Sequence, residues 1–354
     1  MITTPRLAFA GHPIAALALS ALAACGATPQ MGGDDGGGGS GEPPPGGRSL
    51  DATGTYTVHS TFDLATNMPG TAGTVVNTII DATDDPDDPT KWILEQIGKQ
   101  FADGSWEQGL ITDAEALAGG ALNDELLRIA PDFVSTMVQV GQDFGDLAKH
   151  VGLNETLALT PAQSAGSYLA AHTVVGLHYE LGDQKGDLAF ANYQLPDVEV
   201  DNVAVTMDAT GQLTIAAHDV PLGYGKLLRL GLDAAIIPLV DASAHNLNDL
   251  LAHLIDCNAV GQAIASAVDV SVAAGLLAGA CSAALSTGAN LVYTRIGAID
   301  TTALKFSING SARGIDRNSD GQIDTIQTGT WAGTLAYGAT PTPLIPAAFS
   351  GERE

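Results

Sequence analysis

The sequence predicts an α+β fold in which several helices pack on a curved antiparallel β-sheet within a single large domain. Segments with alternating apolar and polar residues occur near both ends and in the middle of the chain, and segments with helical periodicity separate them. The strand-like segments follow one another closely and are joined by turn residues, which favours antiparallel pairing. With 45% hydrophobic but only 5% aromatic residues, the core is expected to consist mainly of Leu, Val, Ile and Ala.

The expected elements follow from these periodicities in chain order. Period-two alternation predicts strands at 56–62, at several places between 157 and 220 (172–179, 187–193, 198–207 and 212–220), and in a closing hairpin of 304–308 with 331–337. Apolar residues at three- and four-residue spacing predict helices at 92–101, 112–129, 131–151, 224–240 and 247–298. The loop 208–211 suits a hairpin, with Gly211 supplying a positive φ.

The N-terminus carries a secretory signal. Arg6 precedes an apolar stretch from Ile14 to Ala24, which ends in the small residues that signal peptidases prefer. Leu22-Ala23-Ala24-Cys25-Gly26 resembles the lipobox of bacterial lipoproteins. That resemblance implies cleavage after residue 24 and lipidation of Cys25. The absence of Asp at position 26 favours the outer membrane or the cell surface over the inner membrane. The alternative is an ordinary secretory signal that happens to contain a cysteine.

Residues 25–50 are expected to form a disordered tether between this signal (1–24) and a folded ectodomain (51–354). The tether contains a run of glycines, the triplet Pro43-Pro44-Pro45 and almost no apolar side chains, so it cannot bury enough surface to fold. Such a segment would hold the ectodomain away from the bilayer, with the membrane as partner through the lipid anchor.

Charge and cysteine content narrow the functional classes. The formal net charge of −26, from 40 acidic against 14 basic residues, argues against binding to nucleic acid or anionic lipid. If Cys25 is lipidated, Cys257 and Cys281 remain as a pair in an oxidising compartment, and we expect a disulfide between them rather than two buried thiols. The long uncharged run between Asp269 and Arg295 is interpreted as a buried core helix, with a transmembrane helix as the alternative.

The most specific motif of the ectodomain is 316-DRNSDGQID-324. Asp316, Asn318, Asp320, Gln322 and Asp324 take the ligand positions of an EF-hand-like calcium loop, and Gly321 permits its sharp turn. Position twelve is Gln327 instead of the bidentate Glu, and the flanks are strands, so the resemblance is to the shorter calcium loops of extracellular folds. Ca²⁺ is therefore the expected structural cofactor, and a polar β-turn is the alternative.

Other polar clusters are weaker candidates. His245, Asp249 and His253 share one face of a predicted helix and could hold a transition metal, but the opposite face is apolar, so a solvated polar face is the favoured interpretation. His172 and His178 share strand parity without a carboxylate neighbour in sequence, and are expected to be structural. Hydrolase, metalloprotease, P-loop and dinucleotide-binding motifs do not occur in the sequence.

These observations predict a membrane-anchored exported lipoprotein whose ectodomain is structural or binding and is not an enzyme. The surplus of apolar helix over aromatic residues suggests an apolar ligand such as a lipid, although ordinary core packing accounts for it as well. The alternative function is a secreted metal-dependent hydrolase that uses the His245, Asp249 and His253 face.

Overall fold

The computed structural model describes residues 50–67, 127–267, 274–301, 304–337 and 340–354, with the single positions Gln108 and Asp124. All of them belong to one compact unit, Arg48–Glu354. Cys25, the tether, the predicted helix 92–101 and most of 112–129 lie outside the described residues. The disulfide between Cys257 and Cys281 is confirmed, with Cα atoms 5.5 Å apart.

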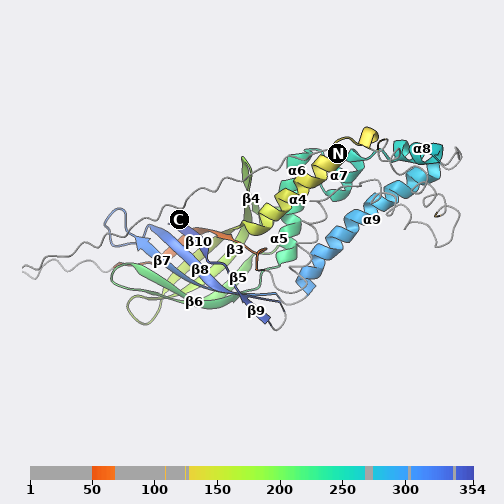
Figure 1. Ribbon diagram of the computed structural model, residues 1–354. Coiled ribbons are helices and arrows are strands. Elements are labelled where there is room, and N and C mark those ends of the chain that lie inside the picture. Colours follow the sequence, from red (N-terminus) through yellow and green to blue (C-terminus); the bar gives the residue numbers. More distant parts are fainter. Residues whose placement is uncertain are drawn as a thin grey trace, which may run out of the picture. The chain divides into compact units, whose positions relative to one another are not determined.

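Strands and helices alternate in blocks along the chain (Figure 1). The strands are β1 (Gly54–Phe62), β2 (Val151–Pro161), β3 (Ser167–Leu181), β4 (Gln184–Ala189), β5 (Val198–Met207), β6 (Gln212–Val220), β7 (Leu304–Ile315), β8 (Thr325–Tyr337), β9 (Thr340–Pro343) and β10 (Ala347–Arg353). The helices are α4 (Phe133–Lys149), η1 (Phe190–Tyr193), α5 (Tyr224–Gly231), η2 (Leu232–Ile236), α6 (Ile237–Val240), α7 (Leu247–Leu254), α8 (Cys257–Ala267) and α9 (Ala274–Thr301).

The prediction of a curved open sheet is wrong, because the sheet closes into an antiparallel barrel. Each strand of the series β1, β2, β3, β5, β6, β7, β8 and β10 pairs with the next, and β10 pairs back with β1. In the closing pair, Tyr56 lies opposite Arg353 and Thr61 lies opposite Ala348. Strands β4 and β9 lie outside this ring, on β3 and β8 respectively. Closure leaves the eight ring strands without a free edge.

In the described residues, the helices lie in connections at one end of the barrel. Because all neighbours are antiparallel, the β1–β2 and β6–β7 connections emerge at the same end, and these two connections carry α4 and α5–α9. The opposite end has the shorter β2–β3, β5–β6 and β7–β8 connections. Figure 1 shows the helices grouped beside the barrel instead of lying across a sheet face.

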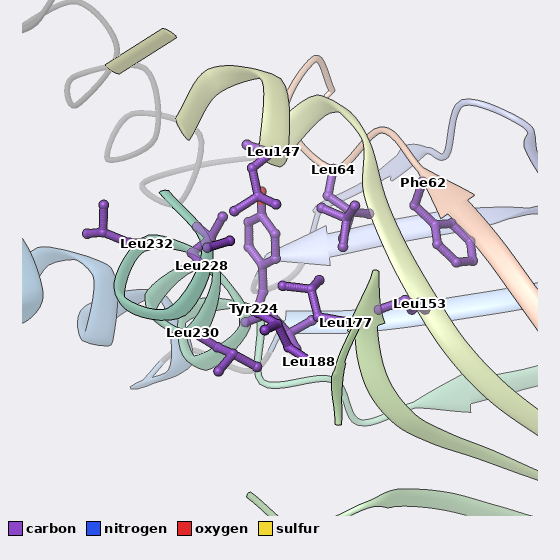
Figure 2. Packing of buried hydrophobic residues seen from close by; sticks show 14 of the residues in the cluster. Phe62, Leu64, Leu147, Leu153, Leu177, Leu188, Tyr224, Leu228, Leu230 and Leu232 are labelled. Atoms are coloured by element: carbon purple, nitrogen blue, oxygen red, sulfur yellow. The ribbon is translucent and has the colours of Figure 1, made fainter. Parts of the chain in front are cut away.

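An apolar junction joins the helices to this end of the barrel. Leu147 of α4, Leu177 of β3, Leu64 and the fully buried Tyr224 of α5 belong to one core cluster, and Figure 2 shows their side chains gathered there. The backbone amide of Leu64 donates to the carbonyl of Ala148, which ties the chain leaving β1 to the end of α4. The helical part is therefore continuous with the barrel core.

Side chains from opposite walls meet inside the barrel. Phe62 of β1 packs edge-on against Phe306 of β7, with ring centroids 5.0 Å apart. Trp331 of β8 stacks on His172 of β3 across the barrel, with centroids 5.5 Å apart, and on Phe349 of the neighbouring strand β10 at 4.3 Å. An eight-stranded barrel is just wide enough for its side chains to fill it. These cross-barrel contacts therefore occupy the interior at the levels where they occur.

The helix α9 satisfies the length and composition of a membrane span. Residues Ala274–Asp300 have a mean hydropathy of 1.3 over their most apolar stretch, of which 39% is buried. One face of α9 packs in the core, through residues such as Leu277 and Ile296, whereas Leu276 and Leu291 are exposed. Length and composition alone do not distinguish a spanning helix from a core helix.

Candidate functional site

A chain of polar side chains crosses the barrel interior. The indole nitrogen of Trp331 donates to the Ser60 hydroxyl at 2.9 Å, and that hydroxyl donates to the Glu155 carboxylate. The other oxygen of Glu155 lies 3.3 Å from Nε2 of His172, and Nδ1 of His172 lies 2.8 Å from Nε2 of His218. Ser60, Glu155 and His172 are almost completely buried. Buried polar groups need partners, and this chain supplies nearly all of them internally.

The direction of each hydrogen bond in this chain follows from its last member. Nδ1 of His218 donates to the carbonyl of Ala216 at 2.9 Å, so Nε2 of a neutral His218 accepts from Nδ1 of His172. Burial lowers the pKa of His218, which favours that neutral form. Nε2 of His172 has no aligned hydrogen-bond partner, and the Glu155 carboxylate is the acidic group that faces it.

Two β-bulges decide which histidines point inward. In β3, Val174 pairs with Glu155 and Gly176 pairs with Asn154, so Val175 is an extra residue. His172, on one side of this bulge, is buried, whereas His178, on the other side, faces outward although it shares the sequence parity of His172. A second register shift, between Ile215 and His218 of β6, turns His218 inward. Bulges re-aim side chains in this way and are common at functional sites.

A groove of about 870 Å³ lies on the outer wall of the barrel, where the β3–β4 hairpin leaves the ring. Three of the protein's eight histidines line it, together with two carboxylates. These five side chains are His59, His150, His178, Glu180 and Asp187. Small residues, among them Gly152 and Gly329, also line it.

The strand register places the polar groups of this groove in contact. His59 lies directly opposite Asn154, and His178 lies directly opposite Asp187. Nδ1 of His59 is 2.7 Å from the Asn154 side-chain oxygen, and Nδ1 of His178 is 2.8 Å from Asp187. The amide nitrogen of Asn154 donates to the same Asp187 carboxylate at 2.8 Å. Hydrogen bonds from Asn154 and then His178 lower the pKa of Asp187.

Because a carboxylate only accepts hydrogen bonds, this ladder fixes the two histidine tautomers. Asp187 accepts a hydrogen bond from the amide nitrogen of Asn154, so the oxygen of Asn154 faces His59 and accepts a hydrogen bond from its Nδ1. His178 likewise donates from Nδ1 to Asp187. His150 lies with Nδ1 3.2 Å from the carbonyl of Asp146. In neutral imidazoles so held, Nε2 carries the free lone pair.

The predicted calcium loop forms a compact turn between β7 and β8. Asp316 accepts from the amides of Ser319 and Gly321 at 2.7 and 2.8 Å, and Asp320 accepts from the amide of Gln322. Gly321 has φ +94°, as the sharp turn requires. Asp324 accepts from the amide of Arg317 at 2.7 Å. The five predicted ligand residues are thus brought into one loop.

The sequence did not predict that Asp51 lies beside this loop. Asp51 pairs with Gln322 as an isolated bridge, and its carbonyl accepts from the amide of Ile323 at 2.9 Å. The start of the barrel chain therefore lies against the loop.

The predicted His245, Asp249 and His253 face is not assembled. His245 precedes the helix α7, which begins at Leu247. The Asp249 carboxylate accepts a hydrogen bond from the side-chain amide of Asn246, the N-cap residue of this helix. His253 pairs instead with Asp241 at 2.8 Å. Within the described part of the chain, no three His, Cys, Asp or Glu side chains are arranged as they stand to hold one metal ion.

Comparisons with known proteins give no relative. No family model, no curated protein and no solved structure matches the chain. The sequence predicted neither the groove nor the interior polar chain, because each of them joins residues from separate strands. The available signal was the set of histidines at strand positions, including His59 and His218, which the strand prediction covered without assigning them a role.

Proposed function

We propose that this protein is an exported lipoprotein, anchored through Cys25, whose barrel domain binds a ligand in the groove on its outer wall. The observation that carries this proposal is that side chains bridge the barrel interior, whereas an open groove lined by polar groups lies on its outer wall. The interior is bridged by contacts such as Trp331 with His172, whereas an open volume of about 870 Å³ lies outside the wall. A binding module fits this arrangement better than a lipid carrier with a hollow barrel.

Three features suit a protein held at the cell envelope. The disulfide between Cys257 and Cys281 would persist in an oxidising compartment. The net charge of −26 favours cations over nucleic acid or anionic lipid. Ca²⁺ bound by the loop 316–324 would stabilise the β7–β8 connection at extracellular calcium levels. We propose the outer membrane or cell surface as the location, because residue 26 is Gly and not Asp.

Metabolic labelling with a radioactive fatty acid tests the anchor. The wild-type chain should incorporate the label and sediment with membranes, whereas Cys25→Ser should do neither, because the acylated thiol is lost. Cys257→Ser serves as the matched control and should still be labelled. A labelled Cys25→Ser chain would overturn the assignment of the anchor.

Native mass spectrometry of the full chain purified from membranes tests where a ligand binds. The spectrum should show no lipid beyond the covalent acyl chains, because side chains fill the barrel where their contacts bridge it. A lipid that remains bound without a covalent bond, and that leaves only on unfolding, would contradict binding on the outer wall. That result would instead support a barrel that encloses an apolar ligand.

A further inference from the structure

We propose that the outer groove binds one divalent transition-metal ion, of the class of Zn²⁺, Ni²⁺ or Cu²⁺, through Nε2 of His59 and His178 and the carboxylate of Glu180. This inference rests on the proposed function, because it names the ligand of the same groove. His150 lines the groove and is available for a fourth position. Imidazole and carboxylate donors at one site suit this class of ion.

The hydrogen bonds of the histidines are those of metal ligands. A histidine that binds a metal through one nitrogen usually donates from the other to a carboxylate, an amide or a backbone carbonyl, which fixes the tautomer and ring orientation. His178 donates to Asp187, His59 donates to Asn154, and Nδ1 of His150 lies beside a backbone carbonyl. One carboxylate, Asp187, holds both His178 and Asn154. Asp187 and Asn154 thus leave Nε2 of His178 and Nε2 of His59 as the nitrogens available to an ion, with Glu180 beside Nε2 of His178.

The donors lie near one another but do not surround one point as they stand. The rings of His59 and His178 have centroids 6.5 Å apart, whereas two imidazoles on one tetrahedral zinc ion are roughly 5 Å apart, given Zn–N bonds of about 2.1 Å. Glu180 already has a carboxylate oxygen 3.5 Å from Nε2 of His178, and its side chain is 69% exposed, so its rotation meets little packing. Binding therefore requires the side chains of His59 and Glu180 to rotate, while His178 keeps its hydrogen bond to Asp187.

Charge in and around the groove favours a cation. Glu180 and Asp187 are acidic, and no Lys or Arg is among the residues that line the described groove. The protein as a whole carries −26, which raises the local concentration of divalent ions at low ionic strength. An anionic ligand such as phosphate would meet repulsion at the same place. The electrostatics therefore agree with the donor set.

Titration of the chelator-stripped full chain in detergent with Zn²⁺, in competition with a chromophoric chelator, tests the inference. One zinc ion should bind per chain, and His59→Ala and His178→Ala should each weaken binding at least tenfold. Asn154→Ala should weaken it about 10- to 100-fold, since it removes only the group that orients His59. His245→Ala is the matched control, because His245 is exposed and does not line the groove. Binding that is absent, or that all four variants weaken equally, would overturn the inference.

A measurement on the unmutated chain removes any dependence on the folding of the variants. Zn²⁺ should protect His59 and His178, but not His245, from modification by diethylpyrocarbonate, as read by peptide mass spectrometry. Equal modification with and without Zn²⁺ would contradict the site. The outcomes separate the two proposals. Zinc binding by a chain that incorporates no label at Cys25 would overturn only the proposed anchor, whereas a labelled chain without lipid in its barrel that binds no zinc would overturn only this inference.

Discussion

Replacing Glu155 tests the hydrogen-bond directions inside the barrel. In Glu155→Gln, the amide oxygen can accept from Ser60 and the amide nitrogen can donate to Nε2 of His172, so each neighbour keeps a partner of the right kind. We therefore expect this variant to lie within about 1 kcal/mol of the wild type in free energy of unfolding. Glu155→Ala removes both partners instead.

The cost of Glu155→Ala follows from the groups it leaves unpaired. The Ser60 hydroxyl proton would remain buried without an acceptor, at about 1–3 kcal/mol, whereas Nε2 of His172 already lacks a hydrogen-bond partner. The side-chain methylenes would leave a small cavity as well, at about 1–2 kcal/mol. The sum is roughly 2–5 kcal/mol. The exposed Glu199 supplies the control, since Glu199→Ala should change stability by less than about 0.5 kcal/mol.

Equilibrium urea denaturation of the full chain, followed by far-ultraviolet circular dichroism at pH 7.5, measures both variants. A Glu155→Gln variant as unstable as Glu155→Ala would refute the reasoning, because it would mean that the charge of Glu155 and not its hydrogen-bonding pattern supports the fold. A Glu155→Ala variant as stable as Glu199→Ala would show that the interior chain contributes nothing.

Three further predictions concern pH, the disulfide and calcium. Because burial lowers the pKa of His218 below the unfolded value of about 6.5, the unfolded state binds more protons below that pH. The free energy of unfolding should then fall on acidification by up to about 1.4 kcal/mol per pH unit. The decrease in urea midpoint between pH 7.5 and 5.5 should be smaller in His218→Gln than in the wild type, and an equal decrease in both would contradict this role of His218. Replacing Cys257 and Cys281 together by Ser should cost about 3–4 kcal/mol in the same denaturation assay, as expected for a loop closed across 24 residues, and a loss below about 1 kcal/mol would mean that the bridge constrains little. Millimolar Ca²⁺ should raise the melting temperature of the wild type and of the control Asp183→Ala but not of Asp320→Ala, whereas an equal rise in all three would place the effect elsewhere.

Local elements of the fold could be predicted from the sequence because their signals are local. The strands β5 (198–207) and β6 (212–220) have the predicted bounds, since alternation and the turn before Gly211 define them. Gly211 has the expected positive φ of +84°. Closure of the barrel could not be predicted in the same way. It depends on pairing between Tyr56 and Arg353 at opposite ends of the chain, and periodicity does not specify which strands become neighbours.

The candidate site was hidden by register and not by composition. Alternation assigns His172 and His178 to the same face, but the extra residue Val175 sends them to opposite faces. Each then finds a carboxylate on a neighbouring strand, Glu155 for His172 and Asp187 for His178. A bulge changes the pairing between two strands and the face to which the following side chains point. No pattern of residue types in the sequence marks its position.

The loop 316–324 has a structural consequence that does not depend on its occupancy. Its residue Gln322 receives a hydrogen bond from Arg353 of β10 at 2.9 Å and lies opposite Asp51, just before β1. The amide of Arg353 also donates to the carbonyl of Asp324. Because β1 and β10 are the pair that closes the ring, the loop holds both partners of the closing pair in register. Any ion that orders this loop would therefore stabilise closure of the barrel, which is the step with the greatest separation in sequence and the largest entropic cost.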